Sequence, residues 1–454
     1  MIEIITIIKA KIFSISPLCI GDKNQEPLIY EDEMAYLPAT SIAGAFRAYL
    51  KSINKDYKKL FGDDPDEKKG LNTSSVIVKD SFARVTDYDR RNGVTIDDRY
   101  GSSEDRKKFE RVYLKDGLEF EIEFKIQGLK SEMDELKNMI YLCLKALDEG
   151  IIRFGGNKSN GLGVFEVQKV EEIEYKLKPI DGLIKYLNNN VEEKADKTDM
   201  VKNMALDNHY VIFKVDGKLT TPLIIEGVDV LDSNDVDARS IGYRISDGKI
   251  QYIIPGSSFK GVLRARVEKI GDYFNTLDRA KRIFGELAKK DSEEDIETKK
   301  KEKKKIKKKE KDKILSRVLV MESKIEEDRE ARYNRTRIDR FTGGVINNAL
   351  MNDIPVKGKT QFNLIYRKTG NESFDNYAIG IIALALRDLS TENMALGGKS
   401  GIGRGRFKAD NMKIRDGDEV VGIDFNARTI SNENRLNRYI KAVEVFEGEE
   451  GGDE

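Results

Sequence analysis

The 454-residue sequence has very little histidine and cysteine. It contains one histidine, His209, and two cysteines, Cys19 and Cys143. A structural zinc site needs four such ligands, and two cysteines allow no disulfide framework. The sequence therefore excludes a zinc or disulfide scaffold and predicts a reducing, cytoplasmic location. A catalytic apparatus of the Ser-His-Asp or Cys-His kind would depend on His209 alone.

Long apolar runs and an excess of one charge are missing as well. The longest apolar runs, such as residues 381–386, are far too short to cross a bilayer, and residues 1–13 alternate like a strand rather than forming a signal peptide. No membrane partner is predicted. The 80 Lys and Arg residues balance 80 Asp and Glu residues. Zero net charge favours a protein held in an assembly over a free nucleic-acid binder, which is usually basic.

The chain contains an internal repeat, because seven segments recur in the same order. Two of them, LPATSIAGAFRAYL and IPGSSFKGVLRARV, share a proline, a serine, a glycine and an arginine at matching positions. We conclude that the chain holds two copies of one module. The matching pairs are 16–21 with 221–227, 37–50 with 254–267, 60–62 with 283–285, 76–81 with 318–323, 94–101 with 336–343, 141–147 with 381–387, and 155–165 with 397–407.

The repeat divides the chain into two domains. The first is predicted at residues 1–187 and the second at 205–420, separated by a polar linker at 188–204 without apolar periodicity. Residues 421–454 are acidic and are predicted to form a solvated tail. Domain 2 carries a Lys-rich insertion at 286–316. This polycation would either bind nucleic-acid backbones or form a solvated helical arm.

Each module has the pattern strand, helix, strand, strand, helix, strand. Pro38 and Pro255 end a strand and precede a helix with an apolar face, and second helices are predicted at 133–148 and 376–388. This order is the ferredoxin-like pattern. The predicted fold class is therefore α+β, with two tandem ferredoxin-like domains that carry inserted loops. Helices should cover one face of each antiparallel sheet.

Two glycine-rich loops, GGNKSNGLG at 155–163 and GGKSGIGRG at 397–405, are the most unusual segments. Glycines let a backbone approach a ligand closely, and exposed N–H groups beside Lys and Arg suit a phosphate chain. Neither loop is a P-loop or a dinucleotide fingerprint. The alternative is a tight turn before an edge strand, but basic residues in both loops favour nucleic-acid binding. The glycines are Gly155, Gly156, Gly161, Gly163, Gly397, Gly398, Gly401, Gly403 and Gly405, and the basic residues are Lys158, Lys399, Arg404 and Arg406.

The segments IPGSSFKGVLR, RTRIDRFTGG and GGKSGIGRGRF together resemble the RAMP superfamily of CRISPR-associated proteins. The likeness extends over both modules and is greatest to the backbone subunits of type III interference complexes. It implies a ferredoxin-like, RRM-related core whose signature is the glycine-rich loop. It also implies three kinds of partner: a crRNA, a target RNA and other effector subunits.

The resemblance also implies roles for particular residues. Lys260 and Arg264 follow the IPGSS segment and would contact crRNA phosphates, as would Arg47 in module 1. Module 1 has alanine at the position of Lys260. Arg337 and Arg340 match a protruding thumb that kinks the guide–target duplex.

In some members of the family an acidic residue upstream of this helix cleaves target RNA with a divalent metal. Segment 222–255 is twelve residues longer than its counterpart 17–38, and the added loop is rich in aspartate. Asp237 best matches the catalytic position and would hold Mg²⁺ or another divalent cation, with Asp235 second. Ordinary loop aspartates are the alternative. Module 1 is predicted to be inactive.

Two other functions remain open. One is a stand-alone, metal-independent endoribonuclease that processes crRNA and depends on His209. The other is a capping subunit that never cuts RNA. EDTA would distinguish the metal-dependent activity from the first alternative.

Overall fold

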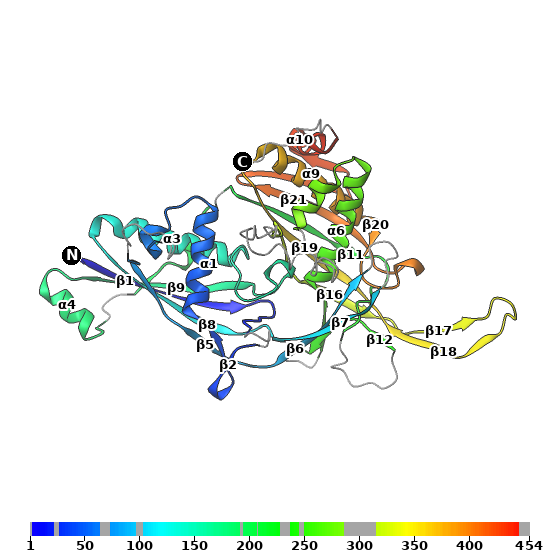
Figure 1. The fold of residues 1–454 in the computed structure, drawn as a ribbon, viewed down its shortest axis with the longest axis horizontal. Helices are drawn as coiled ribbons and strands as arrows, with labels where there is room; N and C mark the ends of the chain where they lie inside the picture. Colours follow the sequence, from blue (N-terminus) through cyan, green and yellow to red (C-terminus); the bar gives the residue numbers. More distant parts are fainter. Residues whose placement is uncertain are drawn as a thin grey trace, which may run out of the picture.

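The chain folds into two halves, each built on an antiparallel sheet, as Figure 1 shows. In the first half, α1 and α3 pack on one face of the sheet, and the short helix α4 lies on the opposite face. A mixed α and β architecture with antiparallel sheets is thereby confirmed. The computed structural model describes residues 2–21, 27–63, 73–96, 103–190, 194–206, 208–227, 237–244, 249–285 and 315–444.

The first half has the sheet order β10-β9-β1-β8-β4. Alternate residues of β1 are buried because they face the helices, and Ala10 pairs with Ile122 on one side and Val170 on the other. The main elements are β1 (Ile4–Ser14), α1 (Ala39–Ser52), β4 (Val76–Val78), β8 (Glu119–Gly128), α3 (Lys130–Asp148) and β9 (Phe165–Lys176).

The second half repeats this arrangement. Its first strand again lies between its last strand and its third, in the order β21-β11-β19, and β15 pairs with β19 as β4 pairs with β8. The matching elements are β11 (Tyr210–Leu219), α6 (Gly256–Tyr273), β15 (Val318–Val320), β19 (Val356–Arg367), α9 (Glu372–Ser390) and β21 (Arg406–Asp416).

Shorter elements extend both halves. They include β2 (Ile29–Tyr30), β3 (Met34–Leu37), α2 (Lys58–Phe61), β5 (Ser81–Arg84), α4 (Ile180–Leu187), β10 (Ala195–Asp196), α5 (Thr198–Lys202), β13 (Gly242–Arg244), β14 (Ile250–Ile254), α7 (Leu277–Phe284), β16 (Ser323–Glu330) and β20 (Thr391–Ala395).

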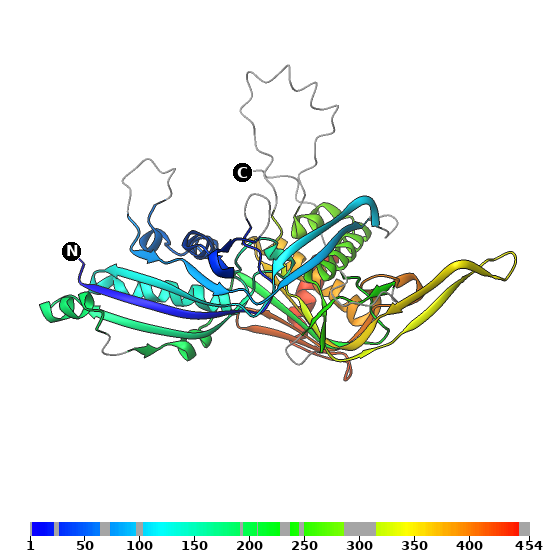
Figure 2. The same ribbon diagram turned by 90° about the horizontal axis from the view of Figure 1, so that it is seen from below.

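Each half carries a hairpin between its second and third core strands. In the first half, β6 (Tyr88–Ile96) and β7 (Ser103–Leu114) reach the second half, where Arg91 forms an ion pair with Glu322. In the second half, β17 (Tyr333–Ile338) and β18 (Val345–Ile354) project from the body at the end opposite α4 (Figure 2). The short strand β12 (Ala238–Arg239) pairs in parallel with β18.

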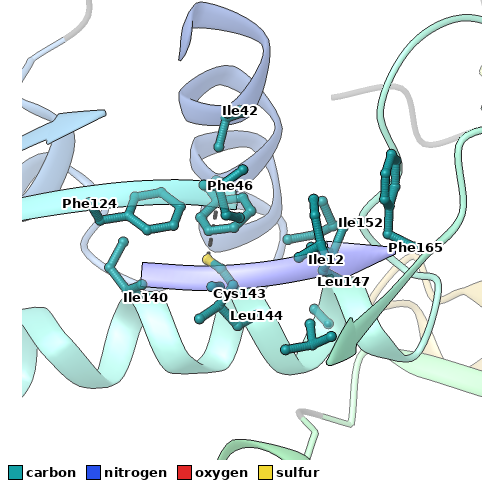
Figure 3. Close-up of a cluster of buried hydrophobic side chains, with 14 of the residues drawn as sticks. Ile12, Ile42, Phe46, Phe124, Ile140, Cys143, Leu144, Leu147, Ile152 and Phe165 are labelled. Atoms are coloured by element: carbon teal, nitrogen blue, oxygen red, sulfur yellow. Dashed lines mark hydrogen bonds between the residues drawn. The ribbon is translucent and has the colours of Figure 1, made fainter. Parts of the chain in front are cut away.

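The core of the first half lies between the sheet and its two long helices, as Figure 3 shows. Phe46 of α1 stacks on Phe124 of β8 with ring centroids 5.1 Å apart. Burial raises the pKa of the neighbouring Cys143 thiol. Both cysteines are free thiols, in agreement with the sequence. None of the helices in the described ranges combines the length and apolar content that crossing a bilayer requires.

Two boundaries differ from those expected. Part of the predicted linker is folded, since α5 buries Val201 against the first half. The predicted tail is also folded from 421 to 444, where β22 (Glu419–Asp424), β23 (Thr429–Ser431) and α10 (Glu433–Glu444) extend the second half. The expectation of a solvated tail is therefore wrong for these residues, because α10 has a narrow apolar face despite its charge. Residues 286–314 of the Lys-rich insertion, and residues 445–454, lie outside the described residues.

Replacing Tyr439 by alanine tests this correction. Its ring is fully buried under α9 and its hydroxyl donates a hydrogen bond to Asp416 at 2.7 Å. Loss of a buried aromatic ring should lower the free energy of unfolding by about 3–5 kcal/mol, measured by urea denaturation. The control is Tyr273→Ala, which removes an exposed ring. Equal stability of the two variants would contradict the packing of α10.

Candidate nucleic-acid interface

The two glycine-rich loops follow the same backbone path. Each contains one short 3₁₀ turn, η2 (Lys158–Asn160) in the first half and η3 (Ser400–Ile402) in the second. The residue before each turn, Asn157 or Lys399, has the left-handed conformation with φ of 52° or 61°. The duplication seen in the sequence therefore extends to local backbone geometry.

The last glycine of each loop is hydrogen-bonded to the segment that follows β1 or β11. The N–H of Gly163 donates to the carbonyl of Pro17, and that of Gly405 to the carbonyl of Pro222, both at 3.0 Å. These glycines have φ of 69° and 75°. An added Cβ would lie 1.8 or 1.9 Å from a backbone oxygen. Only glycine fits these two positions, which explains why the repeat retains it.

The first-half loop borders an open cavity of about 720 Å³. Its other walls are α1, the chain after β1 and the hairpin strand β7. On α1 the lining is made of small residues, including Gly44, Ala45 and Ala48. Among the described residues that line the cavity, none is acidic and three are cationic. The cationic residues are Arg111, Arg153 and Lys158. Small side chains next to cations, with no acidic residue in the described lining, suit a polyanion.

The second-half loop is tied to the projecting hairpin by a buried carboxylate. Asp353 of β18 is fully buried and accepts hydrogen bonds from Arg335 at 2.7 Å and Lys399 at 3.0 Å, and it pairs with Arg404 at 2.6 Å. Burial by itself raises the pKa of Asp353, but the hydrogen bonds from Arg335 and Lys399 and the charge of Arg404 hold that pKa below its usual value. Arg404 also lies over the ring of Tyr333, 5.0 Å from its centroid. The cluster keeps two positive charges in excess.

Among its described residues, the first half has no equivalent of this cluster. Leu114 and Val356 occupy matching positions, since each exchanges two backbone hydrogen bonds with the residue after the loop-holding proline. Three residues before them stand Arg111 and Asp353. The carboxylate of the second half is thus replaced by a cation in the first.

The two glycine-rich loops also differ in charge at matching positions. Asn157 stands where the second half has Lys399, and Leu162 stands where it has Arg404. In the first half the cations line an open cavity, whereas in the second they are partly neutralised by Asp353.

The other predicted RNA-binding residues are dispersed. Arg47 lies over the ring of Tyr57 at 5.2 Å, and Arg264 donates to Glu268 at 2.6 Å on α6. Arg406 donates to the backbone of Glu392 at 2.6 Å. These contacts orient the side chains on their own elements.

Arg337 and Arg340 lie on the projecting hairpin, and both are exposed. The structure brings Lys399 and Arg404 together, and it places Lys158 at the cavity of the first half. The sequence prediction of one basic loop in each half thus corresponds to two separate basic regions.

Besides the Arg91–Glu322 pair, the seam between the halves contains two buried cations. Arg153 is 2% exposed and donates to three carbonyls: Gly150 at 2.7 Å, Lys158 at 2.5 Å and Val320 of the second half at 2.7 Å. Lys260 of α6 is 9% exposed. Burial, together with the charges of Arg153 and Arg264, lowers the pKa of Lys260 to about 7.

Sequence reasoning missed Arg153. It comes two residues before the first glycine-rich loop, but the matching residue of the second half is alanine, so the repeat gave no signal. Its carbonyl acceptor in the second half is 167 residues away along the chain.

Asp237 lies at the base of the projecting hairpin. Its carboxylate accepts the N–H of Asn352 at 2.6 Å, and its own N–H donates to the Asn352 carbonyl at 2.9 Å. The side chain is exposed. Asp235 lies outside the described residues. Within the described ranges no group of three His, Cys, Asp or Glu side chains forms a metal site. A cation at Asp237 would need further oxygen ligands, which the phosphates of a bound RNA could supply.

Two copies of one α+β unit, each with a cationic glycine-rich loop, define a tandem-repeat protein suited to a polyanion. The family model of the RAMP superfamily matches residues 11–166 and 217–408, which is most of both halves. The chain therefore belongs to the RAMP superfamily, and membership gives it a CRISPR-associated, RNA-binding function. Comparison with curated protein sequences finds no match. The resemblance to the RAMP superfamily, and its extension over both modules, are confirmed.

The burial of Lys260 predicts an unusual pH dependence. Because the folded pKa is about 7 and the ordinary value is 10.5, the cost of the buried charge is full below pH 7 and fades between the two values. Lys260→Met should raise the free energy of unfolding by on the order of 3 kcal/mol at about pH 6 and by clearly less at about pH 9.

The control for this measurement is Lys269→Met, which removes an exposed lysine from the same helix. It should change stability little at either pH. If Lys260→Met destabilised the chain at both pH values, Lys260 would have a counter-ion that the structure does not show.

Proposed function

We propose that the chain is a crRNA-binding backbone subunit of a type III CRISPR interference complex. Its two halves, as ferredoxin-like domains, would position guide and target RNA beside other effector subunits. The observation that carries this proposal is the duplicated glycine-rich loop, fixed by the same hydrogen bonds in both halves. A subunit with two such loops can hold two stretches of one sugar-phosphate chain.

The strand order supports the ferredoxin-like assignment. In both halves the order is last, first, third, second, and neighbouring strands are antiparallel. The two long helices α1 and α3 of the first half pack on the same face of this sheet. The hydrophobic pattern of the sequence led to the same arrangement.

The projecting hairpin suits a thumb that contacts the guide–target duplex. Its tip carries Phe341, which is 100% exposed, with Ile338 and Val345 also exposed. Exposed apolar side chains on a hairpin mark a contact surface. Arg337 and Arg340 beside them can neutralise phosphates while the apolar tip meets base pairs.

RNA binding is tested by a matched pair of glycine variants. Gly405→Ala should weaken the affinity for single-stranded RNA by about tenfold, because the added Cβ displaces the loop that would follow the phosphates. Gly128→Ala, outside both loops, should change affinity less than about twofold, because the atoms nearest to its added Cβ lie at ordinary contact distances of 3.5 and 3.9 Å. Fluorescence anisotropy of labelled RNA at fixed salt measures both.

Absence of RNA binding by the unaltered chain would overturn the proposal. The assembled particle offers a second test, since it should contain a guide RNA of defined length.

Target cleavage by the second half is the catalytic part of the proposal. Asp237 is exposed and held in place by Asn352 at the base of the hairpin, where a kinked target strand would pass. Together with phosphate oxygens, one carboxylate is enough to hold Mg²⁺, which would activate the attacking oxygen when bound. The first half offers no described counterpart of this residue, and we propose that it is inactive.

Asp237→Asn tests this role without losing the acceptor for the Asn352 N–H. In the assembled complex the variant should lose one cleavage product while crRNA binding stays unchanged, measured on labelled target RNA with and without EDTA. Cleavage at an unchanged rate would refute the assignment and favour a capping subunit that never cuts.

The geometry gives less support to a stand-alone crRNA-processing enzyme. Such an enzyme would depend on His209, which precedes β11. The glycine-rich loop is fixed at Pro222, beyond the other end of this strand. A strand of this length spans about 30 Å, so His209 lies far from the glycine-rich loop of the second half.

A further inference from the structure

The seam between the halves holds positive charge without a counter-ion. Within the part of the chain that the structure describes, the Lys260 ammonium has no hydrogen-bond or ion-pair partner, and the only charged groups that act on it are Arg153 and Arg264. Arg264 is itself paired with Glu268. The Nη2 atom of Arg153 is buried and also has no hydrogen-bond partner.

Such an arrangement is costly for the free protein. A buried charge without a partner loses its hydration and gains nothing in return, and two like charges add repulsion. An apolar residue of similar size in place of Lys260 would make a more stable seam. An anion between the two cations would remove both costs.

The position of Arg153 connects this seam to the cavity of the first half. Arg153 lines that cavity, and its guanidinium also binds Lys158 of the loop and Val320 of the second half. The loop reaches α6 beside these contacts, because a side chain at Gly256 would meet the carbonyl of Asn160 at 2.3 Å. An RNA strand that ran from the cavity toward the second half would therefore pass the seam.

The site is present once in the chain. Lys260 has alanine as its counterpart in the first half, and Arg153 has alanine as its counterpart in the second. Neither module alone contains both cations, and the fusion of two modules brings them together.

We propose that Lys260 and Arg153 form a composite anion site in the seam, which takes one phosphodiester of an RNA strand where it passes from one half to the other. This inference rests on the proposed RNA-binding function. Bound phosphate would bridge α6 of the second half and the loop of the first, so that RNA also joins the halves.

Lys260→Met is the test variant, because it removes the charge and keeps the length of the side chain. Arg153 is unsuitable, since its loss would also free three carbonyls. The full chain is titrated with a fluorescently labelled single-stranded RNA long enough to span both halves, over a range of KCl concentrations. Affinity should fall about tenfold, and the slope of log affinity against log salt should become shallower by about 0.7, as for one lost phosphate contact.

Lys269→Met is the matched control and should leave affinity and slope nearly unchanged. If the unaltered chain binds RNA but Lys260→Met has the same affinity and slope, the seam site is wrong and the proposed function stands. If the unaltered chain binds no RNA, the proposed function itself fails.

A second measurement identifies the source of the anion. Sulfate should raise the melting temperature of the unaltered chain more than that of Lys260→Met at about pH 6, where Lys260 is charged. If sulfate protects the unaltered chain in this way while RNA affinity is the same in both proteins, the seam holds an adventitious ion only, and the proposal is overturned.

Discussion

One buried guanidinium group, that of Arg153, connects the first glycine-rich loop to the second half. Arg153 donates to carbonyls at the end of α3, in the first glycine-rich loop and in β15 of the second half. These hydrogen bonds lie out of water, where each is strong and where an unpaired carbonyl would be costly. The loop therefore cannot shift without disturbing the seam, and the cavity beside it keeps its shape. The structure uses a buried charge to fix the position of a backbone that carries few side chains.

The regular elements of both halves could be predicted from the sequence because the burial of one face gives helices and strands a periodic pattern of apolar residues. The helices expected at 133–148 and 376–388 are α3 at Lys130–Asp148 and α9 at Glu372–Ser390. α10 was missed because it buries only Leu436, Tyr439 and Val443 within an acidic segment whose composition favours solvent. Its stability comes from packing against α9, and a local sequence pattern does not reveal a contact with a distant helix.

The site was predictable in part for the same reason. The loop glycines were identifiable because the repeat displays them twice, and six of the nine have a positive φ, which disfavours other residues. Asp353 and Arg153 gave no such signal. The partners of Asp353 include Lys399, which is 46 residues away, and the role of Arg153 exists only after the halves meet. Buried polar networks are set by tertiary contacts, so one sequence reveals their residues but not their pairing.

The two halves share a scaffold and differ in the charge placed on it. A buried ion cluster such as Asp353 with Arg335, Lys399 and Arg404 contributes less stability than apolar packing of equal volume. The first half shows that the scaffold can do without it, since Asn157 and Leu162 replace the loop cations there. The second half accepts this lower stability at the contact between its hairpin and its glycine-rich loop. There Asp353 holds both elements together. We infer that the first half would hold a polyanion through the cations that line its cavity, whereas the second half uses part of its charge to align hairpin and loop, as the positioning of Asp237 beside a bound strand would require.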